Sequence, residues 1–187
     1  MTVAPHTRPD WDRLYETAAG QEGHFSMDQA AAAGFSPHLL IHHVKAGKLQ
    51  RVRRGVYRLV HYPAGDHEEL VAIWLWANRA GTFSHQTALL LHGLSDVLPA
   101  RVRLTLPLGW QRRRLRVPAG VDLHFADLDD ADRTWFGSVP ATSVQRTLTD
   151  CVATHLPDDI VQQAIDQAVA RGLIGEADRA IAHGLTP

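Results

Sequence analysis

The chain has little cysteine and no long apolar run, and both absences narrow what it can be. Of its 187 residues only Cys151 is a cysteine, so an internal disulfide cannot form and a zinc site of several cysteines is excluded. No apolar run approaches the roughly 20 residues that a membrane helix needs. The first residues, MTVAPHTRPDWDRLYE, lack the basic and then apolar order of a secretory signal. We therefore expect a cytoplasmic protein with no membrane partner.

Motifs for catalysis and nucleotide binding are also missing. The chain has no glycine-rich phosphate loop and no Gly-x-Ser-x-Gly elbow. Ser84 and His85 are better explained as a helix N-cap and a first-turn residue than as a nucleophile with its base. His38 and His42 have the i, i+4 spacing of zinc ligands, but no third ligand lies nearby in sequence. Cys151 lies on an apolar helix face, which favours a structural role. We expect no enzymatic activity, no cofactor and no metal.

Charge is nearly balanced overall but unevenly placed along the chain. The formal net charge is -1, which argues against indiscriminate binding to nucleic acid. Residues 45–58 and residues 101–116 nevertheless carry lysine and arginine with no acid among them. Five aspartates follow between residues 122 and 132. The chain is therefore neutral only on average, and each basic segment needs an explanation of its own.

Helix-capping residues, glycines and apolar spacing in residues 1–62 predict three short helices. The first is expected over Trp11–Ala19, where apolar residues recur at helical spacing. The second begins at Ser26 with a Ser-x-x-Gln capping box and ends at the next glycine. The third has Ser36 as its N-cap and Pro37 in its first turn. About three residues that include a glycine join the second and third helices, which is typical of a helix-turn-helix.

A basic hairpin is predicted directly after the third helix. It turns at Arg53-Arg54-Gly55, and its expected apolar anchors are Leu49, Val52, Val56 and Leu59. A hairpin behind a helix-turn-helix is a wing, whose arginines would contact phosphates or the minor groove while the helix reads base edges. On that helix Leu40, Ile41 and Val44 are predicted to pack inward. The predicted DNA-binding residues are Ser36, His38, His42, Lys45, Lys48, Arg51, Arg53, Arg54 and Arg58.

Residues 63–187 are predicted to form a separate, small mixed α/β domain. Residues 61–65 have the composition of a hinge, and helices are expected from Asp66 and from Ser84. Two alternating strands are predicted at 101–106 and 121–125. Val139-Pro140 is expected to lead into a helix opened by Thr142, and further helices are predicted over 157–172 and 176–183. The fold class is therefore α+β, with an N-terminal winged helix-turn-helix and a mixed α/β domain after it.

The connection between the two predicted strands carries a second basic patch, Arg112, Arg113, Arg114 and Arg116. Three interpretations stay open for this loop. It could make a second phosphate contact, bind a partner protein, or be a solvated turn that the following aspartates balance.

Three stretches resemble the AbiEi-like antitoxins of type IV toxin–antitoxin (abortive infection) systems. They are RVRRGVYRL, FSHQTALLLHGLSDVLPARVRLTLP and VPATSVQRTLTDCV, in the order in which that family has them. The resemblance implies a repressor of its own operon that binds operator repeats and counters a nucleotidyltransferase-type toxin. Longer members carry a larger C-terminal domain linked to neutralising the toxin, so this chain is similar to the short form.

Two functional classes follow from these observations, and one residue pattern has both a functional and a structural explanation. The first class is a DNA-binding autorepressor, whose partners would be double-stranded DNA, a cognate toxin and, as an open alternative, a second copy of the chain. The second is a module that binds the toxin directly without operator binding. Arg146, Thr147 and Asp150 recur in the family pattern, but a buried ion pair with internal capping explains them as well. Nothing after Asp150 has the Asp…Glu-x-Lys cluster of the nucleases to which related front ends are fused.

Overall fold

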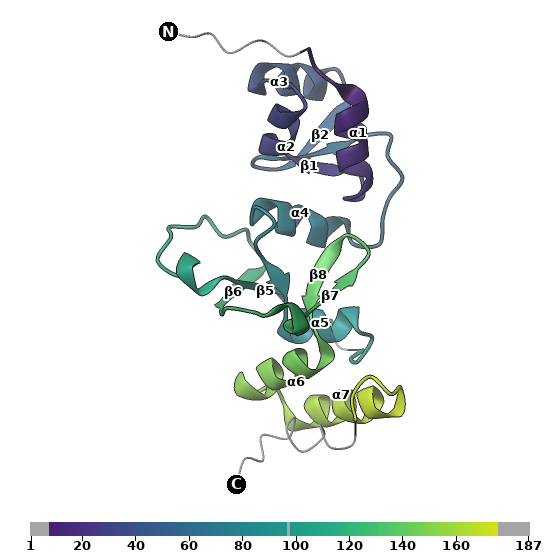
Figure 1. Ribbon diagram of the computed structural model, residues 1–187, viewed down its shortest axis with the longest axis vertical. Coiled ribbons are helices and arrows are strands. Elements are labelled where there is room, and N and C mark those ends of the chain that lie inside the picture. Colours follow the sequence, from purple (N-terminus) through teal and green to yellow (C-terminus); the bar gives the residue numbers. More distant parts are fainter. Residues whose placement is uncertain (1–7, 97, 176–187) are drawn as a thin grey trace. The chain divides into compact units, whose positions relative to one another are not determined.

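The computed structural model of the protein describes residues 8–96 and 98–175, and this part of the chain has a mixed α+β fold (Figure 1). The predicted combination of helices and sheets is confirmed. The chain divides into two compact units with the boundary between Arg79 and Ala80. The predicted helix over residues 176–183 lies outside the described residues.

The first unit combines helices with a three-stranded sheet. Its elements are α1 (Trp11–Ala19), β1 (His24–Ser26), α2 (Met27–Ala32), α3 (Pro37–Lys45), β2 (Leu49–Arg53), β3 (Val56–Leu59) and α4 (Glu68–Trp76). The strand order is β1-β3-β2, and both pairs are antiparallel. Ser26 forms both hydrogen bonds of a capping box at the start of α2, and the Ser36 hydroxyl accepts a 3.2 Å bond from the Leu39 N–H at the start of α3. The caps therefore set where both helices begin.

Helices α1, α2 and α3 bury their apolar faces on one side of this sheet. The core contains Leu14, Ala18, Phe25, Ala30, Ala33, Phe35, Leu40, Leu49, Tyr57 and Leu59. Two predicted members are absent from it. Ile41 is 51% exposed because Leu40 and Val44, one turn apart, already fill the space beneath α3. Val52 is 37% exposed because the register between β2 and β3 shifts between Arg51 and Arg53, which breaks the alternation of the strand.

Helix α4 belongs to the first unit, although a boundary at residues 62/63 was expected. It packs against all three strands of the small sheet, and Arg58 and Val56 point toward it because Tyr57 and Leu59 face the other way. The Arg58 Nε donates a 2.9 Å bond to Glu68, and the backbone N–H of His67 donates a 3.0 Å bond to Glu22. The segment predicted as a hinge therefore joins two parts of one compact unit.

The second unit is built on a mixed five-stranded sheet. Its strands are β4 (Thr82–Phe83), β5 (Val102–Leu106), β6 (Val121–Phe125), β7 (Arg133–Phe136) and β8 (Val139–Thr142). The order is β6-β5-β4-β8-β7; β5–β6 and β4–β8 are parallel, and the other pairs are antiparallel. The two predicted strands at residues 101–106 and 121–125 are present. Val139-Pro140 was expected to lead directly into a helix, but these residues begin β8, the second strand of the β7–β8 hairpin.

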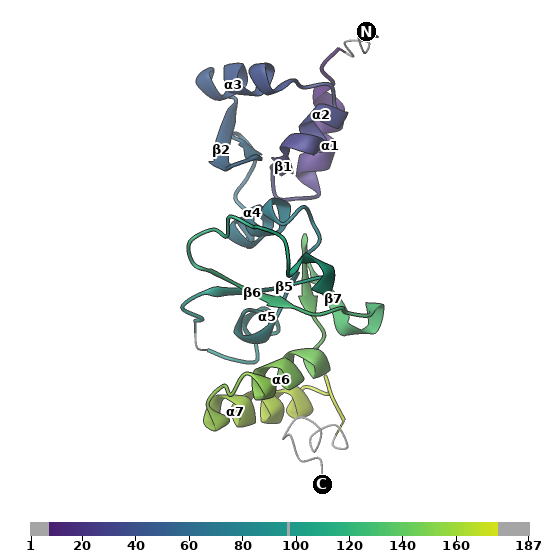
Figure 2. The ribbon, with the colours of Figure 1, turned by 90° about the vertical axis from the view of Figure 1, so that its left-hand side faces the viewer.

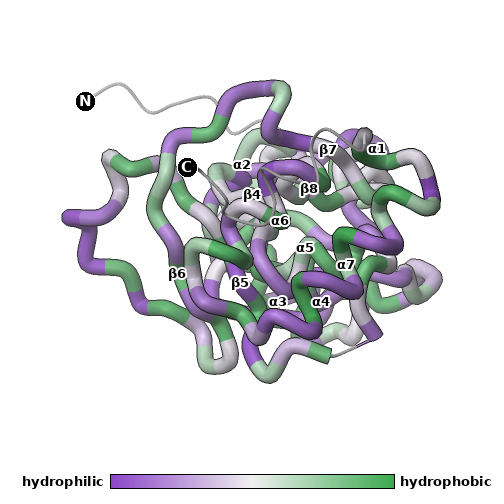
Figure 3. The backbone as a smooth tube through the Cα atoms, turned by 90° about the horizontal axis from the view of Figure 1, so that it is seen from below, coloured by the Kyte–Doolittle hydropathy of each residue, from purple (hydrophilic) through white to green (hydrophobic). Residues whose placement is uncertain are grey.

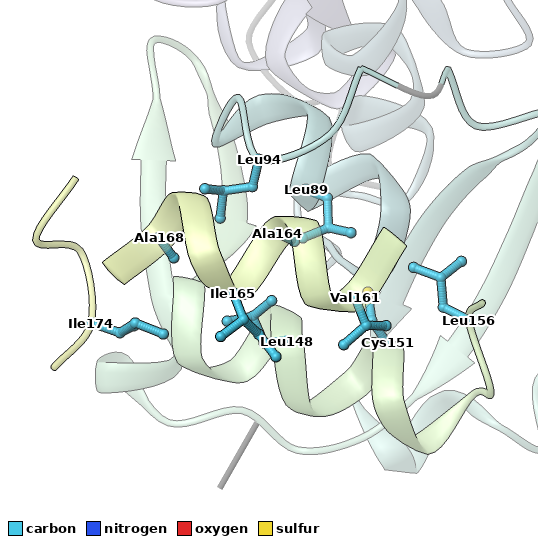
Figure 4. Close-up of a cluster of buried hydrophobic side chains, with 10 residues drawn as sticks. All are labelled: Leu89, Leu94, Leu148, Cys151, Leu156, Val161, Ala164, Ile165, Ala168 and Ile174. Carbon is cyan, nitrogen blue, oxygen red and sulfur yellow. The ribbon is translucent and has the colours of Figure 1, made fainter. Parts of the chain in front are cut away.

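Helices of the second unit enclose a separate apolar core (Figure 4). They are α5 (His85–Leu91), α6 (Val144–Ala153) and α7 (Asp158–Ala170), with short 3-10 turns η1 (Leu108–Trp110) and η2 (Asp130–Asp132) in the connections. The core contains Leu89, Leu94, Leu148, Cys151, Leu156, Val161, Ala164, Ile165, Ala168 and Ile174. Cys151 is almost fully buried there, and this burial raises the pKa of its thiol to about 12. The thiol is thus protonated and packed as a small apolar group.

Candidate nucleic-acid interface

One stripe of α3 is exposed, and it contains the residues predicted to read DNA. His38, His42 and Lys45 are exposed along it, and Ser36 is exposed at the N-cap. Ile41 lies in the same stripe, at i+3 from His38. Its apolar side chain was assigned to the core from the sequence, and only the i, i+4 pairing of Leu40 with Val44 could have shown that it faces outward.

His43 marks the edge of this stripe and is held by packing. Its ring lies 4.8 Å from the Trp11 ring and 6.0 Å from the Phe35 ring, measured between centroids. Burial lowers the pKa of His43, and the nearby His42 and Lys48 lower it further. Burial is the largest cause, and the smaller contributions of His42 and Lys48 reflect the positive charge near this end of α3, which disfavours one more cation.

The hairpin β2–β3 lies beside α3 and carries the other predicted contacts (Figures 1 and 2). Arg54 and Gly55 form its turn, and Gly55 has a φ of +77°, which an L side chain rarely adopts. Lys48, Arg51 and Arg54 are exposed. Within residues 8–96 and 98–175, none of these three cations is in an ion pair, and neither is Lys45. These four residues, Lys45, Lys48, Arg51 and Arg54, are called the exposed cation set below.

Two predicted DNA contacts are instead engaged with α4. Arg58 donates to Glu68 and, through Nη2, to the carbonyl of Tyr62 at 2.9 Å, and its side chain is only 13% exposed. A phosphate contact by Arg58 therefore requires the break of a largely buried ion pair. Arg53 is intermediate, since its Nη2 lies 3.6 Å from the exposed carboxylate of Glu69. The structure thus brings the helix residues and the exposed cation set together, and it sets Arg58 apart.

The second basic patch is exposed and is not balanced by the aspartates that follow it. Arg112, Arg113, Arg114 and Arg116 are all exposed in the connection between η1 and β6. In the described part of the chain, three of the five aspartates pair with other arginines: Asp122 with Arg101 and Arg103, Asp130 with Arg133, and Asp132 with Arg146. Asp127 and Asp129 accept bonds from backbone N–H groups instead. The basic segment 101–116 therefore contains two groups of arginines. Arg101 and Arg103 are paired with Asp122 on the sheet, whereas the loop arginines are in no ion pair with a described residue.

The Ser84–His85 pair lies in a buried polar layer between the sheet and α5. Ser84 is fully buried, and its hydroxyl accepts a 2.8 Å bond from the Thr105 hydroxyl and lies 2.9 Å from His85 Nδ1. It occupies the N-cap position of α5 but its hydroxyl makes no capping bond, because Thr105 and His85 engage it. The His85 ring stacks on the His124 ring at 3.8 Å. The arrangement gives Ser84 a packing role and no access to a substrate.

The arginine of the VPATSVQRTLTDCV stretch, Arg146, links two elements of the second unit. Arg146 donates to Asp150 at 2.9 Å and to Asp132 at 3.0 Å, which ties α6 to the η2 turn. Thr147 donates to the carbonyl of Thr142 at 3.1 Å. Burial raises the pKa of Asp150 despite the opposing effect of Arg146. These contacts agree with the structural interpretation of Arg146, Thr147 and Asp150.

Metal ligation and membrane crossing find no support in the described residues. No group of three or more histidine, cysteine, aspartate or glutamate side chains in this part of the chain could hold a metal ion. His38 and His42 stand on the exposed face of α3 without a third ligand. Among the same residues, no helix is both long enough and apolar enough to span a bilayer.

We predict that Arg58→Ala destabilises the first unit, whereas Arg54→Ala does not. Removal of the Arg58 side chain leaves Glu68 and the Tyr62 carbonyl without their donor, which should lower the free energy of unfolding by about 2 to 3 kcal/mol. Arg54 is exposed and unpaired, so its removal should change stability by less than about 0.5 kcal/mol. Urea denaturation followed by circular dichroism measures both. Equal stability of the two variants would contradict the internal role of Arg58.

We also predict that the second unit loses stability in mild acid through His85. Burial, together with the nearby charges of His124 and Arg103, lowers the pKa of His85 from 6.5 to about 3. Between these values the unfolded chain binds a proton that the folded chain does not, so stability is full above pH 6.5 and is lost as the pH falls. The expected slope is about 1.4 kcal/mol per pH unit for this one group.

His85→Asn should remove this slope, because asparagine tolerates the positive φ of 52° at that position and does not titrate. His155→Asn is the matched control, since His155 is exposed and has a φ of 56°. Urea denaturation at pH 7 and pH 5 gives the comparison. If His85→Asn kept the pH dependence of the wild type, the burial of a neutral His85 would not be its cause.

Comparison with known proteins agrees with the predicted resemblance over the first unit. Residues 12–60 match the family described as "Transcriptional regulator, AbiEi antitoxin", a range that runs from α1 to the end of β3. No curated protein matches the chain. The fold is similar to the crystal structure of the Rv2827c protein from Mycobacterium tuberculosis, with a TM-score of 0.56 and 16% identity over 100% of this chain and 76% of that one. The resemblance to the AbiEi antitoxins is thereby confirmed over residues 12–60.

Proposed function

We propose that the protein is a sequence-specific DNA-binding autorepressor. In this proposal α2 and α3 form the helix-turn-helix, the β2–β3 hairpin is its wing, and α3 enters the major groove. The observation that carries it is the partition of charge in the first unit. The exposed cation set gathers on the end of α3 and on the hairpin beside it without ion pairs among the described residues, while Arg58 is neutralised inside.

The two groups of residues would divide the work of recognition. Lys48, Arg51 and Arg54 of the exposed cation set would contact phosphates and set the register of the protein on the duplex, which carries no sequence information by itself. His38, His42 and Lys45 would present hydrogen-bond donors to base edges in the major groove. The buried Leu40 and the capped N-terminus fix the rotation of α3, so its exposed stripe is presented in one orientation.

Ile41 adds an apolar contact to this stripe. It is 51% exposed at the centre of α3, where burial in a protein core cannot explain an isoleucine. The only apolar feature of the major-groove edge is the 5-methyl group of thymine, which aliphatic side chains recognise by contact. We therefore include Ile41 among the residues that would select the operator sequence.

The antitoxin part of the proposal rests on the family match. That family is described as a transcriptional regulator and antitoxin, so we propose that the protein also counters a cognate nucleotidyltransferase-type toxin in the cytoplasm. The second unit would then be available for protein contacts, and operator repeats would recruit more than one copy. A gene for a nucleotidyltransferase-like protein next to this one would support this part, and its absence would count against it.

The central experiment measures binding to the DNA upstream of the protein's own gene. Fluorescence anisotropy of a labelled duplex, repeated at several salt concentrations, gives both affinity and the slope of log K against log salt. We predict that Arg51→Ala with Arg54→Ala reduces the magnitude of that slope by about 0.9 for each phosphate that the variant no longer neutralises, and weakens binding to all sequences alike.

Arg133→Ala is the control for this measurement, because Arg133 is an exposed arginine of the second unit with a distant acidic neighbour at 3.9 Å. It should leave the slope unchanged. An unchanged slope in the Arg51/Arg54 variant would remove the hairpin from the interface. Failure of the wild type to prefer its upstream DNA over random sequence would favour the module that binds a partner protein without operator binding.

We predict that Ile41 makes binding sensitive to thymine methyl groups. Replacement of operator thymines by uracil removes only the 5-methyl group, and it should weaken wild-type binding about threefold or more for each contacted base. Ile41→Ala should bind thymine and uracil operators equally. His38→Ala serves as the control that keeps the methyl sensitivity. Equal methyl sensitivity in the wild type and in Ile41→Ala would exclude the contact while leaving DNA binding itself intact.

A further inference from the structure

The second unit has an open groove that neither core nor the DNA interface explains. Its volume is about 500 Å³, and its lining residues come from β6, from the connection that leads to β6 and from the position directly before β5. The backbone trace in Figure 3 shows a long loop that projects beside β6. The apolar side chains that line it are Leu115, Val117, Val121, Leu123 and Phe125. Arg101 and Arg113 supply cations to the same lining. The groove therefore combines an apolar wall with positive charge.

The groove borders a strand edge that is open to another chain. β6 is the last strand in the sheet order β6-β5-β4-β8-β7. Val102 N–H donates to the Gly120 carbonyl at 2.8 Å and Ala126 N–H donates to the Leu106 carbonyl at 3.1 Å, so the even-numbered residues point their backbone groups toward β5. The N–H and C=O of Leu123 and Phe125 therefore point away from the sheet, where no described strand pairs with them.

The loop beside this edge is positively charged and partly fixed in place. The Arg113 guanidinium lies 4.1 Å above the Trp110 ring centroid, a cation–π contact that limits its motion. Arg112, Arg114 and Arg116 are exposed on either side of it. Asp122, the carboxylate in the groove lining, already binds Arg101 and Arg103. The charge near the groove is thus net positive.

Charge decides which occupant fits this edge. A second copy that paired its own β6 here would bring two arginine-rich loops together, and like charges across such a contact oppose association. A DNA backbone would satisfy the arginines but would leave the apolar wall without a partner. An extended protein segment that alternates apolar and acidic residues satisfies the strand edge, the wall and the arginines at once.

We propose that the β6 edge and the adjacent groove form a docking site for such an acidic, extended segment of a partner protein. The partner would add a strand by backbone hydrogen bonds to Leu123 and Phe125. Its apolar side chains would enter the groove, and its carboxylates would meet Arg113 and the neighbouring loop arginines. This site shares no residue with the proposed DNA interface, because its residues all belong to the second unit.

The probe for this site is a fluorescein-labelled synthetic peptide of alternating Glu and Val, added to the full-length protein. Anisotropy should show saturable binding that a peptide of alternating Lys and Val does not reproduce. A version of the acidic peptide with N-methylated backbone amides on the strand-pairing edge should also fail, because it cannot complete the ladder. In NMR spectra, the amides of Leu123 and Phe125 should exchange more slowly when the peptide is bound.

Variants of the protein locate the site. Arg113→Ala with Arg114→Ala should weaken binding of the acidic peptide about tenfold, since the change removes two cations on exposed residues that support no core. Arg51→Ala with Arg54→Ala, in the first unit, is the matched control and should bind the peptide as the wild type does. Equal binding by the two double variants, or no binding of the acidic peptide by the wild type, would overturn the proposal. The proposal would also be overturned if Arg113→Ala with Arg114→Ala weakened binding of random duplex DNA and left binding of the acidic peptide unchanged.

Discussion

The ion pair between Arg58 and Glu68 keeps one arginine of the β2–β3 hairpin away from solvent. It neutralises the one arginine of β3 and attaches α4 to the sheet face opposite α1, α2 and α3. With that face covered, the hairpin can expose its remaining cations only at its turn and along β2. The same contact therefore joins α4 to the sheet and leaves Arg51 and Arg54 as the hairpin's exposed arginines.

The local signals of the first unit could be predicted, and the long-range contacts could not. Ser26 and Ser36 cap their helices through bonds to residues three positions away, so a short sequence pattern is enough to place α2 and α3. The partner of Arg58 lies ten residues away, beyond a proline and a glycine, and no periodicity links the two. For this reason the basic block 45–58 was predicted as one surface, although one of its arginines is internal.

Side-chain direction limited the prediction of the site in a similar way. Apolar residues at 40, 41 and 44 all fit a buried helix face, but a helix of nine residues on a small sheet can bury only a narrow stripe, and Ile41 falls outside it. In the second unit, the β7–β8 hairpin was missed because Pro140 and the exposed Trp135 hide the alternation that marks a strand. The polar layer around Ser84 could not be predicted from the sequence, since its threonines and histidines come from strands and helices far apart in sequence.

The formal net charge of -1 is a poor guide to what this protein can bind, because the charges act locally. Four described aspartates of the second unit, Asp122, Asp130, Asp132 and Asp150, are paired with arginines of the same unit, at distances of 2.5 to 3.9 Å. At physiological ionic strength, exposed charges farther apart than about 8 Å are largely screened from one another. The acids therefore neutralise their own neighbours and leave the fields at the hairpin and at the arginine-rich loop largely intact. A basic surface can then act on its partner while the chain as a whole stays nearly neutral, which limits attraction to nucleic acid elsewhere on the molecule.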